Sequence, residues 1–152
     1  MEQVNFQQLN KHEKKLLDLA KKTAEKSVSF DKHKIGSAIC DAGGRIFIGA
    51  TISKKRIIGS TCAERMALDN LLFCGLRKPK LIVIVGKMHG RKEMHLCTPC
   101  GRCREMFQEV CQWGKIKDIN FLISNWTKKM IIRTKLSELL PLAFLSENSD
   151  NI

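Results

Sequence analysis

The chain has 152 residues, of which 43% are hydrophobic and 28% are charged, as in a single globular domain with enough chain for a hydrophobic core. No apolar run is long enough to cross a membrane, and the polar N-terminus lacks the pattern of a secretion signal, so we expect a cytoplasmic protein with no membrane partner. In that compartment the seven cysteines are expected to bind metal or pack in the core, not to form disulfides.

Positive charge dominates the sequence, with 27 Lys and Arg residues against 15 acidic residues and a net charge of +12. Such a surplus favours anionic partners, nucleic acid among them. The basic residues are scattered, however, and aromatic residues that could stack on the bases of a single strand make up only 6%. We interpret the charge as a basic, soluble surface and do not favour nucleic acid as the partner.

The first third of the chain predicts a helix followed by a hairpin. Leucines and alanines at helical spacing predict an amphipathic helix over about 9–26. Residues 35–40 and 45–52 are apolar runs that favour strands, and the Asp-Ala-Gly-Gly turn at 41–44 joins them as a hairpin.

The middle of the chain predicts two helices with a buried strand between them. Helical spacing over 62–74 ends at Gly75, a typical helix stop. The continuous apolar run 80–86 favours a strand inside a sheet. A helix over 99–113 is predicted to begin at Pro99 and to end before Gly114.

The last third predicts two strands, 118–124 and 129–133, and a short helix at 137–140. The order α-β-β-α-β-α-β-β-α indicates an α/β fold with a mixed five-stranded sheet covered by helices. Because there is no repeat, linker or low-complexity segment, we expect one domain over residues 1–152, with a flexible tail at 145–152.

Cys62, Cys100 and Cys103 form a pattern that predicts a metal site: a cysteine with Glu64 two residues on, followed later by Pro-Cys-x-x-Cys. Three thiolates can hold a zinc ion and leave its fourth position open. Cys100 and Cys103 are three residues apart at a predicted helix start, so both face one side, and the helix N-terminus favours thiolates. A Cys-x-x-Cys pair alone is also typical of a redox pair, but the joint pattern favours zinc.

The remaining cysteines are predicted to be structural. Cys40, Cys74 and Cys111 lie on apolar faces, which indicates packing in the core. Cys97 lies just outside the motif and is either a bystander or an alternative ligand; we favour a bystander.

Charged residues within the motif have predicted roles beside the metal. This layout is typical of zinc-dependent deaminases of cytosine- and adenine-type bases, in which Glu64 would take a proton from the attacking water and deliver it to the nitrogen of the base ring and to the leaving amine. Since three thiolates over-neutralise Zn²⁺, nearby cations would withdraw the excess charge, and Arg65 and Arg102 are better candidates than Arg104. His89 and His95 precede the second run and are expected at the surface.

Beyond the zinc motif, the chain resembles the cytidine deaminase family in its short, three-cysteine, usually homotetrameric branch, to which the blasticidin-S deaminases are related. Residues 35–39 are similar to the family's V-G-A-A-L, residues 44–49 to G-x-I-F-T-G and residues 138–144 to E-L-L-P-x-A-F. The resemblance implies a three-layer α/β/α fold, one zinc ion per subunit at two helix N-termini, and conversion of an amine to a carbonyl with release of ammonia. It also implies a homotetramer in which Phe144 stacks near the base in a neighbouring subunit's site.

The residues expected to bind the nucleoside depart from the family pattern. Thr51 and Ser53 stand where the family's G-x-N-I-E-N run has the asparagine and glutamate that hold the ribose hydroxyls, and Lys54, Lys55 and Arg56 follow. These three cations are interpreted either as a binding site for an anionic group or as a basic surface loop. The further departures are His33 for an aromatic residue, Ile57 near an expected tyrosine, and Glu105 for a glutamine. With Ala63 beside the first cysteine, the predicted substrate-binding residues are Thr51, Ser53, Ala63, His33 and Phe144.

The sequence therefore predicts zinc-dependent hydrolytic deamination of a cytosine nucleoside, cytidine or deoxycytidine, to uridine or deoxyuridine and ammonia, as in pyrimidine salvage. One alternative is a divergent deaminase of another cytosine compound: a blasticidin-S-like nucleoside, a modified cytidine or a nucleotide. Another is a polynucleotide-binding or editing deaminase, supported only by the net charge. A purely structural zinc domain is a third, but such a site needs a fourth ligand and has no use for Glu64.

Overall fold

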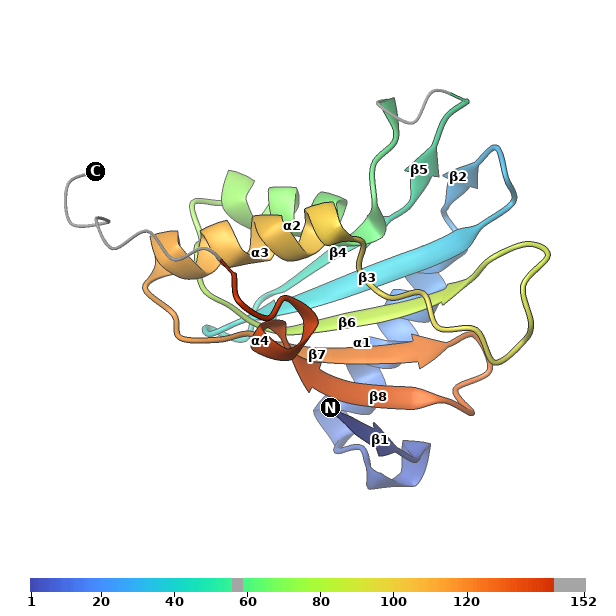
Figure 1. The fold of residues 1–152 in the computed structure, drawn as a ribbon, viewed down its shortest axis with the longest axis horizontal. Helices are drawn as coiled ribbons and strands as arrows, with labels where there is room; N and C mark the ends of the chain where they lie inside the picture. Colours follow the sequence, from blue (N-terminus) through green and yellow to red (C-terminus); the bar gives the residue numbers. More distant parts are fainter. Residues whose placement is uncertain (56–58, 144–152) are drawn as a thin grey trace.

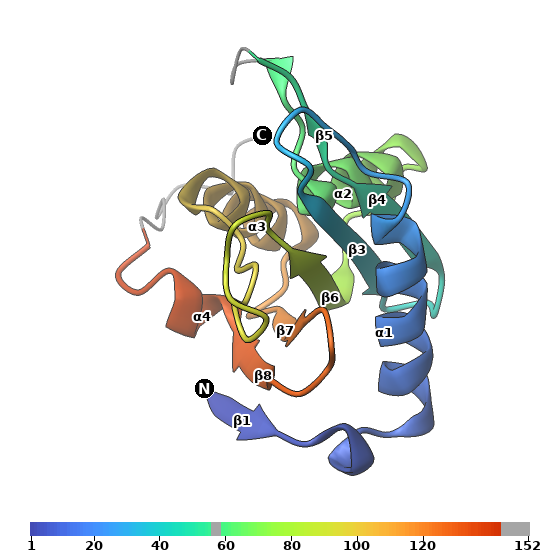
Figure 2. The same ribbon diagram turned by 90° about the vertical axis from the view of Figure 1, so that its right-hand side faces the viewer.

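A computed structural model describes residues 1–55 and 59–143, and these form a central mixed sheet with helices on both faces (Figures 1 and 2). The six strands lie in the order β1-β8-β7-β6-β3-β4. Their bounds are β1 Glu2–Val4, β3 Lys34–Asp41, β4 Ile46–Ala50, β6 Pro79–Lys87, β7 Asn120–Asn125 and β8 Ile131–Lys135. The parallel pair β6 and β7 lies at the centre, and the other neighbours are antiparallel.

The helices divide between the two faces of the sheet. α1 (Lys11–Ala24) covers one face, and α2 (Ala63–Phe73) and α3 (Gly101–Gly114) lie side by side over the other (Figure 2). A short 3-10 helix (Phe6–Gln8) precedes α1, and α4 (Leu136–Leu139) follows β8. The structure confirms the predicted three-layer α/β/α arrangement. No helix of the described ranges is both long and apolar enough to cross a bilayer.

Each face of the sheet has its own hydrophobic core, because side chains of successive strand residues alternate between the two faces. Under α1 the core is formed by Leu16, Leu17, Ala20, Ala38, Val83, Val85 and Leu122, among others. Under α2 and α3 it is formed by Ile39, Leu68, Leu71, Ile84, Phe107, Phe121 and Ile123, among others. The β3 and β6 runs are apolar at consecutive positions since both of their faces are buried.

On each face of the sheet, one glycine lets a helix approach a strand closely. A Cβ atom on Gly36 would lie 2.1 Å from the carbonyl oxygen of Ala20 in α1. A Cβ atom on Gly49 would lie 2.2 Å from the carbonyl oxygen of Ala63, the first residue of α2. The positions of both helices therefore depend on the absence of a side chain at one strand residue.

The predicted number of strands is wrong: the sheet has six strands, not five. The additional strand is β1, which pairs antiparallel with β8 from Glu2 to Val4. β2 (Val28–Ser29) and β5 (Ile52–Ser53) form a second, two-stranded parallel sheet that was not predicted either. Segments of two or three residues carry too little periodicity to indicate a strand, and they pair here because the fold brings a partner beside them.

The predicted bounds of the longer elements are close to the observed ones. The helix expected over 9–26 spans Lys11–Ala24, and its N-cap residue is Asn10, whose side chain accepts a hydrogen bond from the Glu13 backbone N–H at 2.9 Å. The predicted flexible tail at 145–152 lies outside the described residues.

Candidate metal centre

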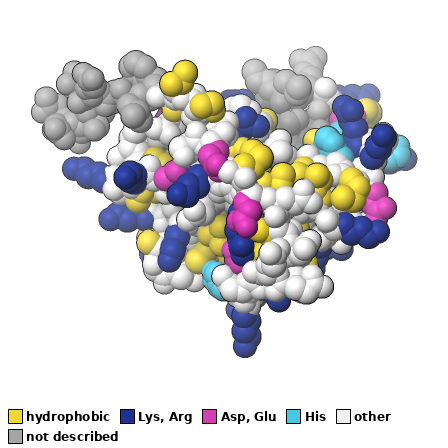
Figure 3. Space-filling model, turned by 60° about the horizontal axis from the view of Figure 1, so that its bottom comes forward, with side chains coloured by type: hydrophobic (Ala, Val, Ile, Leu, Met, Phe, Trp, Pro, Cys, Tyr) yellow, Lys and Arg dark blue, Asp and Glu magenta, His cyan; other side chains and the backbone are white. Residues whose placement is uncertain are grey.

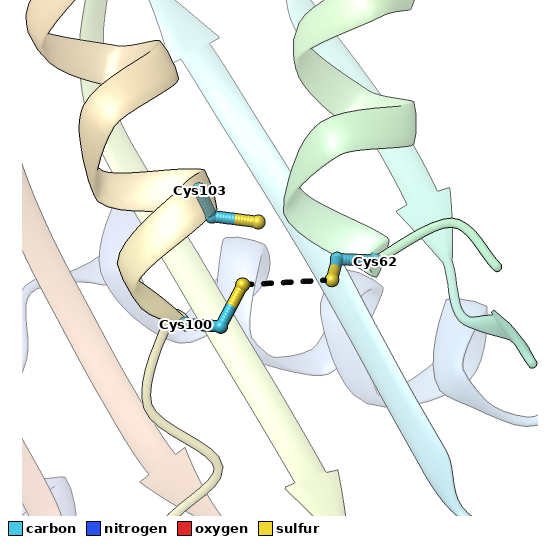
Figure 4. Close-up of side chains that lie close together, drawn as sticks. All are labelled: Cys62, Cys100 and Cys103. Carbon is cyan, nitrogen blue, oxygen red and sulfur yellow. Dashed lines mark hydrogen bonds between the residues drawn. The ribbon is translucent and has the colours of Figure 1, made fainter. Parts of the chain in front are cut away.

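Three cysteine thiols converge where the N-termini of α2 and α3 meet (Figure 4). Cys62 is the N-cap residue of α2, Cys100 is the N-cap residue of α3, and Cys103 lies in the first turn of α3. Their Sγ atoms all lie within 4.8 Å of one another, and those of Cys62 and Cys100 are 3.9 Å apart. The residues that the sequence predicted as metal ligands are therefore neighbours in space.

The three sulfurs fit a zinc ion by spacing and by chemistry. Tetrahedral coordination with Zn–S bonds of about 2.3 Å would place the sulfurs about 3.8 Å apart, close to the observed separations. Cys103 is buried, Cys62 is half-buried and Cys100 is exposed, so the cluster is open on one side. Within the described residues this cluster has no fourth ligand, as expected of a catalytic site that leaves one position for water or substrate.

The electrostatics of the cluster favour thiolates. Hydrogen bonds from Cys103 and Cys100, together with the charges of Arg65 and Arg102, lower the pKa of Cys62 to about 6 despite its partial burial. The hydrogen bond to Cys62 and burial raise the pKa of Cys103. The negative charge therefore gathers first on Cys62, at the positive end of α2.

Glu64 is a buried carboxylic acid beside these thiols. It lies in the first turn of α2, its residue is 4% exposed, and burial and the charge of Cys62 raise its pKa to about 7. Burial and the charge of Glu64 in turn raise the pKa of the Cys97 thiol to about 11. The site thus pairs a soft metal-binding cluster with one acid able to hold or release a proton near neutrality.

The other cysteines mostly lie where the sequence predicted. Cys40 and Cys111 are buried in the two cores. Cys97 is buried against Gly86 and does not belong to the three-sulfur cluster, in line with a bystander. The core prediction for Cys74 is wrong: α2 ends at Phe73, and Cys74 is the exposed C-cap residue, so it leaves the face that the helical spacing assigned to it.

The three arginines of the motif differ in their surroundings. Arg65 and Arg102 act electrostatically on Cys62, and Arg65 also contacts Asp69, with 3.6 Å between Nε and Oδ2. Arg104 instead donates hydrogen bonds to the carbonyl oxygens of Pro99 at 2.8 Å and Leu139 at 2.9 Å. Arg104 therefore ties the segment before Cys100 to α4.

The predicted substrate-binding run lies next to the metal cluster. Ile52, between Thr51 and Ser53, pairs with Thr61 through two backbone hydrogen bonds of 2.9 and 2.8 Å, and Thr61 immediately precedes Cys62. Thr51 and Ser53 are half-buried. The run that departs from the family pattern is thus adjacent to the candidate ligands.

The remaining predicted substrate-binding residues have different surroundings. Ala63 is fully buried at the start of α2. His33 is half-buried before β3, and its backbone N–H donates to the hydroxyl of Ser29 at 3.1 Å. Arg56, Ile57 and Phe144 lie outside the described residues.

Two buried polar residues of the sheet, Ser37 in β3 and Asn125 at the end of β7, were not predicted. The Ser37 hydroxyl is fully buried and has no hydrogen-bond partner among the described residues. The Asn125 side chain, also fully buried, donates to the Glu93 carbonyl oxygen at 3.0 Å and so fixes the loop between β6 and α3. Ser37 lies inside the apolar run 35–40, which indicates a buried position, whereas nothing in its local sequence distinguishes Asn125 from a surface residue.

Comparisons with known proteins agree with the geometry. Residues 10–122 match the family model described as the cytidine and deoxycytidylate deaminase zinc-binding region. The chain is 30% identical over 135 residues to a cytidine deaminase of Sporosarcina psychrophila, covering 88% of this chain and 92% of that protein. It is 28% identical over 124 residues to a cytidine deaminase of Halalkalibacterium halodurans, covering 82% and 86%. The crystal structure of cytidine deaminase from Burkholderia pseudomallei superposes with a TM-score of 0.74 and 29% identity, covering 90% of this chain and 100% of that one.

Proposed function

The chain belongs to the cytidine and deoxycytidylate deaminase family, whose members are zinc-dependent hydrolases, and we propose that it deaminates cytidine or deoxycytidine with Glu64 as its proton carrier. One observation carries the proposal: three thiols within 4.8 Å at two helix N-termini, with a buried carboxyl group two residues after the first. A structural zinc domain would have no use for that acid.

In the proposed reaction, water adds to C4 of the cytosine ring, and the exocyclic amine leaves as ammonia. When bound by Cys62, Cys100 and Cys103, zinc supplies a Lewis acid that activates water. The Glu64 carboxylate takes one proton from the water and passes it to the ring nitrogen N3. It then carries the second proton to the departing amine, so the products are uracil nucleoside and ammonia. Arg65 and Arg102 reduce the negative charge of the three thiolates.

Replacing Glu64 by glutamine tests the proton-carrying role. Glu64→Gln keeps size and polarity but cannot carry a proton, so kcat for cytidine should fall by about 10²–10⁴-fold or more while zinc content stays unchanged. Ammonia release and metal analysis are the measurements. Glu109 is an exposed acidic residue in α3, so Glu109→Gln serves as the matched control and should keep full activity. Near-normal turnover by Glu64→Gln would contradict the assignment.

The altered substrate-binding run is proposed to weaken recognition of the ribose. Thr51 and Ser53 are shorter than the amide and carboxylate of the family pattern, and a site that lacks its polar partners discriminates poorly between sugars. We expect weak turnover of cytidine and little distinction from deoxycytidine. The variant Thr51→Asn with Ser53→Glu should raise kcat/KM for cytidine. Cytidine turnover of ~10⁴ M⁻¹s⁻¹ or better in the unaltered protein, with no gain in the variant, would show the substitutions to be neutral.

The assembly and the location extend the same proposal. We expect a cytoplasmic homotetramer in which Phe144 completes a neighbouring subunit's site, as the family resemblance implies. Sedimentation analysis of the full chain and of a chain ending at Pro141 tests this expectation. A monomer that stays fully active without the residues from Leu142 onward would contradict it.

A further inference from the structure

The end of the sheet that carries the metal cluster also carries a groove lined by cations. β6 and β7 run parallel and finish together, with Gly86 beside Asn125. From the end of β6 the chain returns through a long loop to the start of α3, where Cys100 is the N-cap residue, and α3 then runs back across the sheet (Figure 1). Open α/β sheets bind ligands outside the carboxyl ends of their parallel strands.

We define the basic groove as the hollow lined by Lys32, Lys87, Arg91, Lys92 and Trp126, with a volume of about 380 Å³. It lies among the turn before β3, the loop after β6 and the turn after β7. All four cations are exposed. Figure 3 shows Lys, Arg and His side chains gathered at the right-hand end of the face it presents.

The charge of the basic groove is not balanced by its own residues. Glu93 is the one acidic residue among those that line it, and Glu93 contacts Lys129, with 3.7 Å between the charged atoms. Within the described residues, the side chains of Lys32, Arg91 and Lys92 form no hydrogen bond or ion pair. His89 and His95 also line the groove and add no negative charge.

The basic groove is held in shape by its surroundings. The Lys87 ammonium lies 4.3 Å from the centroid of the Trp126 ring, a cation–π contact that fixes this cation. The buried Asn125 side chain holds the loop through the Glu93 carbonyl oxygen at 3.0 Å and bonds the Thr127 hydroxyl at 3.1 Å. Lys87 is therefore already positioned and loses less freedom when it binds an anion.

The loop that forms the groove leads directly into the metal cluster. His95 lines the groove, Cys97 two residues later is buried beside Glu64, and Cys100 is a candidate ligand. A molecule with its cytosine at the cluster therefore has a cationic surface on the loop that supplies one of the ligands.

We propose that the basic groove binds phosphate groups of a cytosine nucleotide, either a mononucleotide or a single strand that contains the target cytosine. This proposal rests on the proposed function for the reaction at the metal but not for the binding. Arginine and lysine are the residues that contact phosphates, and several unpaired cations in one open groove suit more than one phosphate. The net charge of +12 strengthens the attraction at a distance.

The test compares two double variants that each remove two positive charges. Arg91→Gln with Lys92→Gln alters the basic groove. Lys115→Gln with Lys117→Gln alters exposed residues just after α3, at the opposite end of that helix from the metal cluster. The probes are a fluorescent 12-nucleotide single strand with one cytosine and dCMP, titrated at a series of salt concentrations. Cytidine kcat/KM is measured in parallel.

We expect the groove variant to bind the strand several-fold more weakly at low salt. The logarithm of its association constant should also fall less steeply with the logarithm of the salt concentration, with a slope smaller in magnitude by about 1.4, because two contacts worth ~0.7 each are lost. The control variant should bind as the unaltered protein does, and both variants should keep cytidine turnover within about two-fold, since neither touches the catalytic residues.

If dCMP binding falls as well, a mononucleotide phosphate is sufficient; if only strand binding falls, the groove binds a strand. An unaltered protein that binds neither probe, or an equal loss in both variants, would overturn the proposal. Absence of cytidine turnover with intact strand binding would instead contradict the proposed function alone.

Discussion

The two faces of the sheet are packed by the same physical means and yet differ in what they bury. The α1 face buries an apolar cluster, and the buried hydroxyls of Thr23 and Ser124 there each donate a hydrogen bond to a backbone carbonyl oxygen. The layer under α2 and α3 is equally apolar over most of its area, but at one end it contains Glu64 and Cys103, and Ser37 lacks a partner. Buried polar groups cost free energy of folding unless they find partners.

This difference indicates which face the protein uses for chemistry. On the α1 face the buried side chains pack the helix against the sheet, and Gly36 allows the two to approach closely. On the other face the same close approach, at Gly49, fixes the first turn of α2, which presents Cys62 and Glu64. Ionisable groups are thus held on a rigid helix pair, and binding of zinc offsets the cost of gathering three thiols.

The largest expected effect comes from removing one cysteine on each face. Cys100→Ala should lose most of the zinc and at least 10²-fold in activity (an order-of-magnitude expectation), and the melting temperature should fall because metal binding contributes to folding. Cys40→Ala, which removes a buried thiol from the α1 face, should keep its zinc. Metal analysis and thermal unfolding are the measurements. Full zinc occupancy in Cys100→Ala would mean that another residue is the ligand.

A smaller effect is expected from filling the close contact on each face. Gly36→Ala and Gly49→Ala would each place a Cβ atom within about 2.2 Å of a helix carbonyl oxygen, so each should lower the free energy of unfolding by about 1–3 kcal/mol. Only Gly49→Ala displaces the first turn of α2, so only this variant should also weaken zinc binding. Denaturant unfolding and competition with a zinc chelator separate the two outcomes. Equal zinc affinity in both variants would show that the turn is not held by Gly49.

The long elements of the fold were predictable from the sequence, and the short ones were not. The helices and long strands are indicated by their hydrophobic spacing, and Cys62, Cys100 and Cys103 by a motif whose spacing reflects helix-start geometry. β1 and the pairing of β2 with β5 escaped prediction because two or three residues show no periodicity and pair only with distant segments. Cys74 was misplaced because spacing along α2 continues past Phe73, where the helix itself stops.

The polar residues that support the site were the least predictable part. Asn125 anchors the loop after β6 through Glu93, a residue 32 positions away, and the cations of the basic groove come from two separate segments, the turn before β3 and the loop after β6. Each of these residues has an ordinary local sequence. Their significance depends on contacts between segments that only the folded chain brings together.

The smallest effect is expected from two buried serines, one on each face. Ser124 faces α1 and donates a hydrogen bond to the Asn125 carbonyl oxygen at 2.9 Å, whereas Ser37 faces α2 and has no partner among the described residues. Ser124→Ala should therefore lower the free energy of unfolding by about 1 kcal/mol. Ser37→Ala removes an unpaired hydroxyl and should leave that free energy unchanged or raise it by up to about 1 kcal/mol. Denaturant unfolding of the two zinc-loaded variants measures the difference. A loss of stability in Ser37→Ala as large as that in Ser124→Ala would show that a buried water satisfies Ser37, and the two faces would then be alike in their hydrogen bonding.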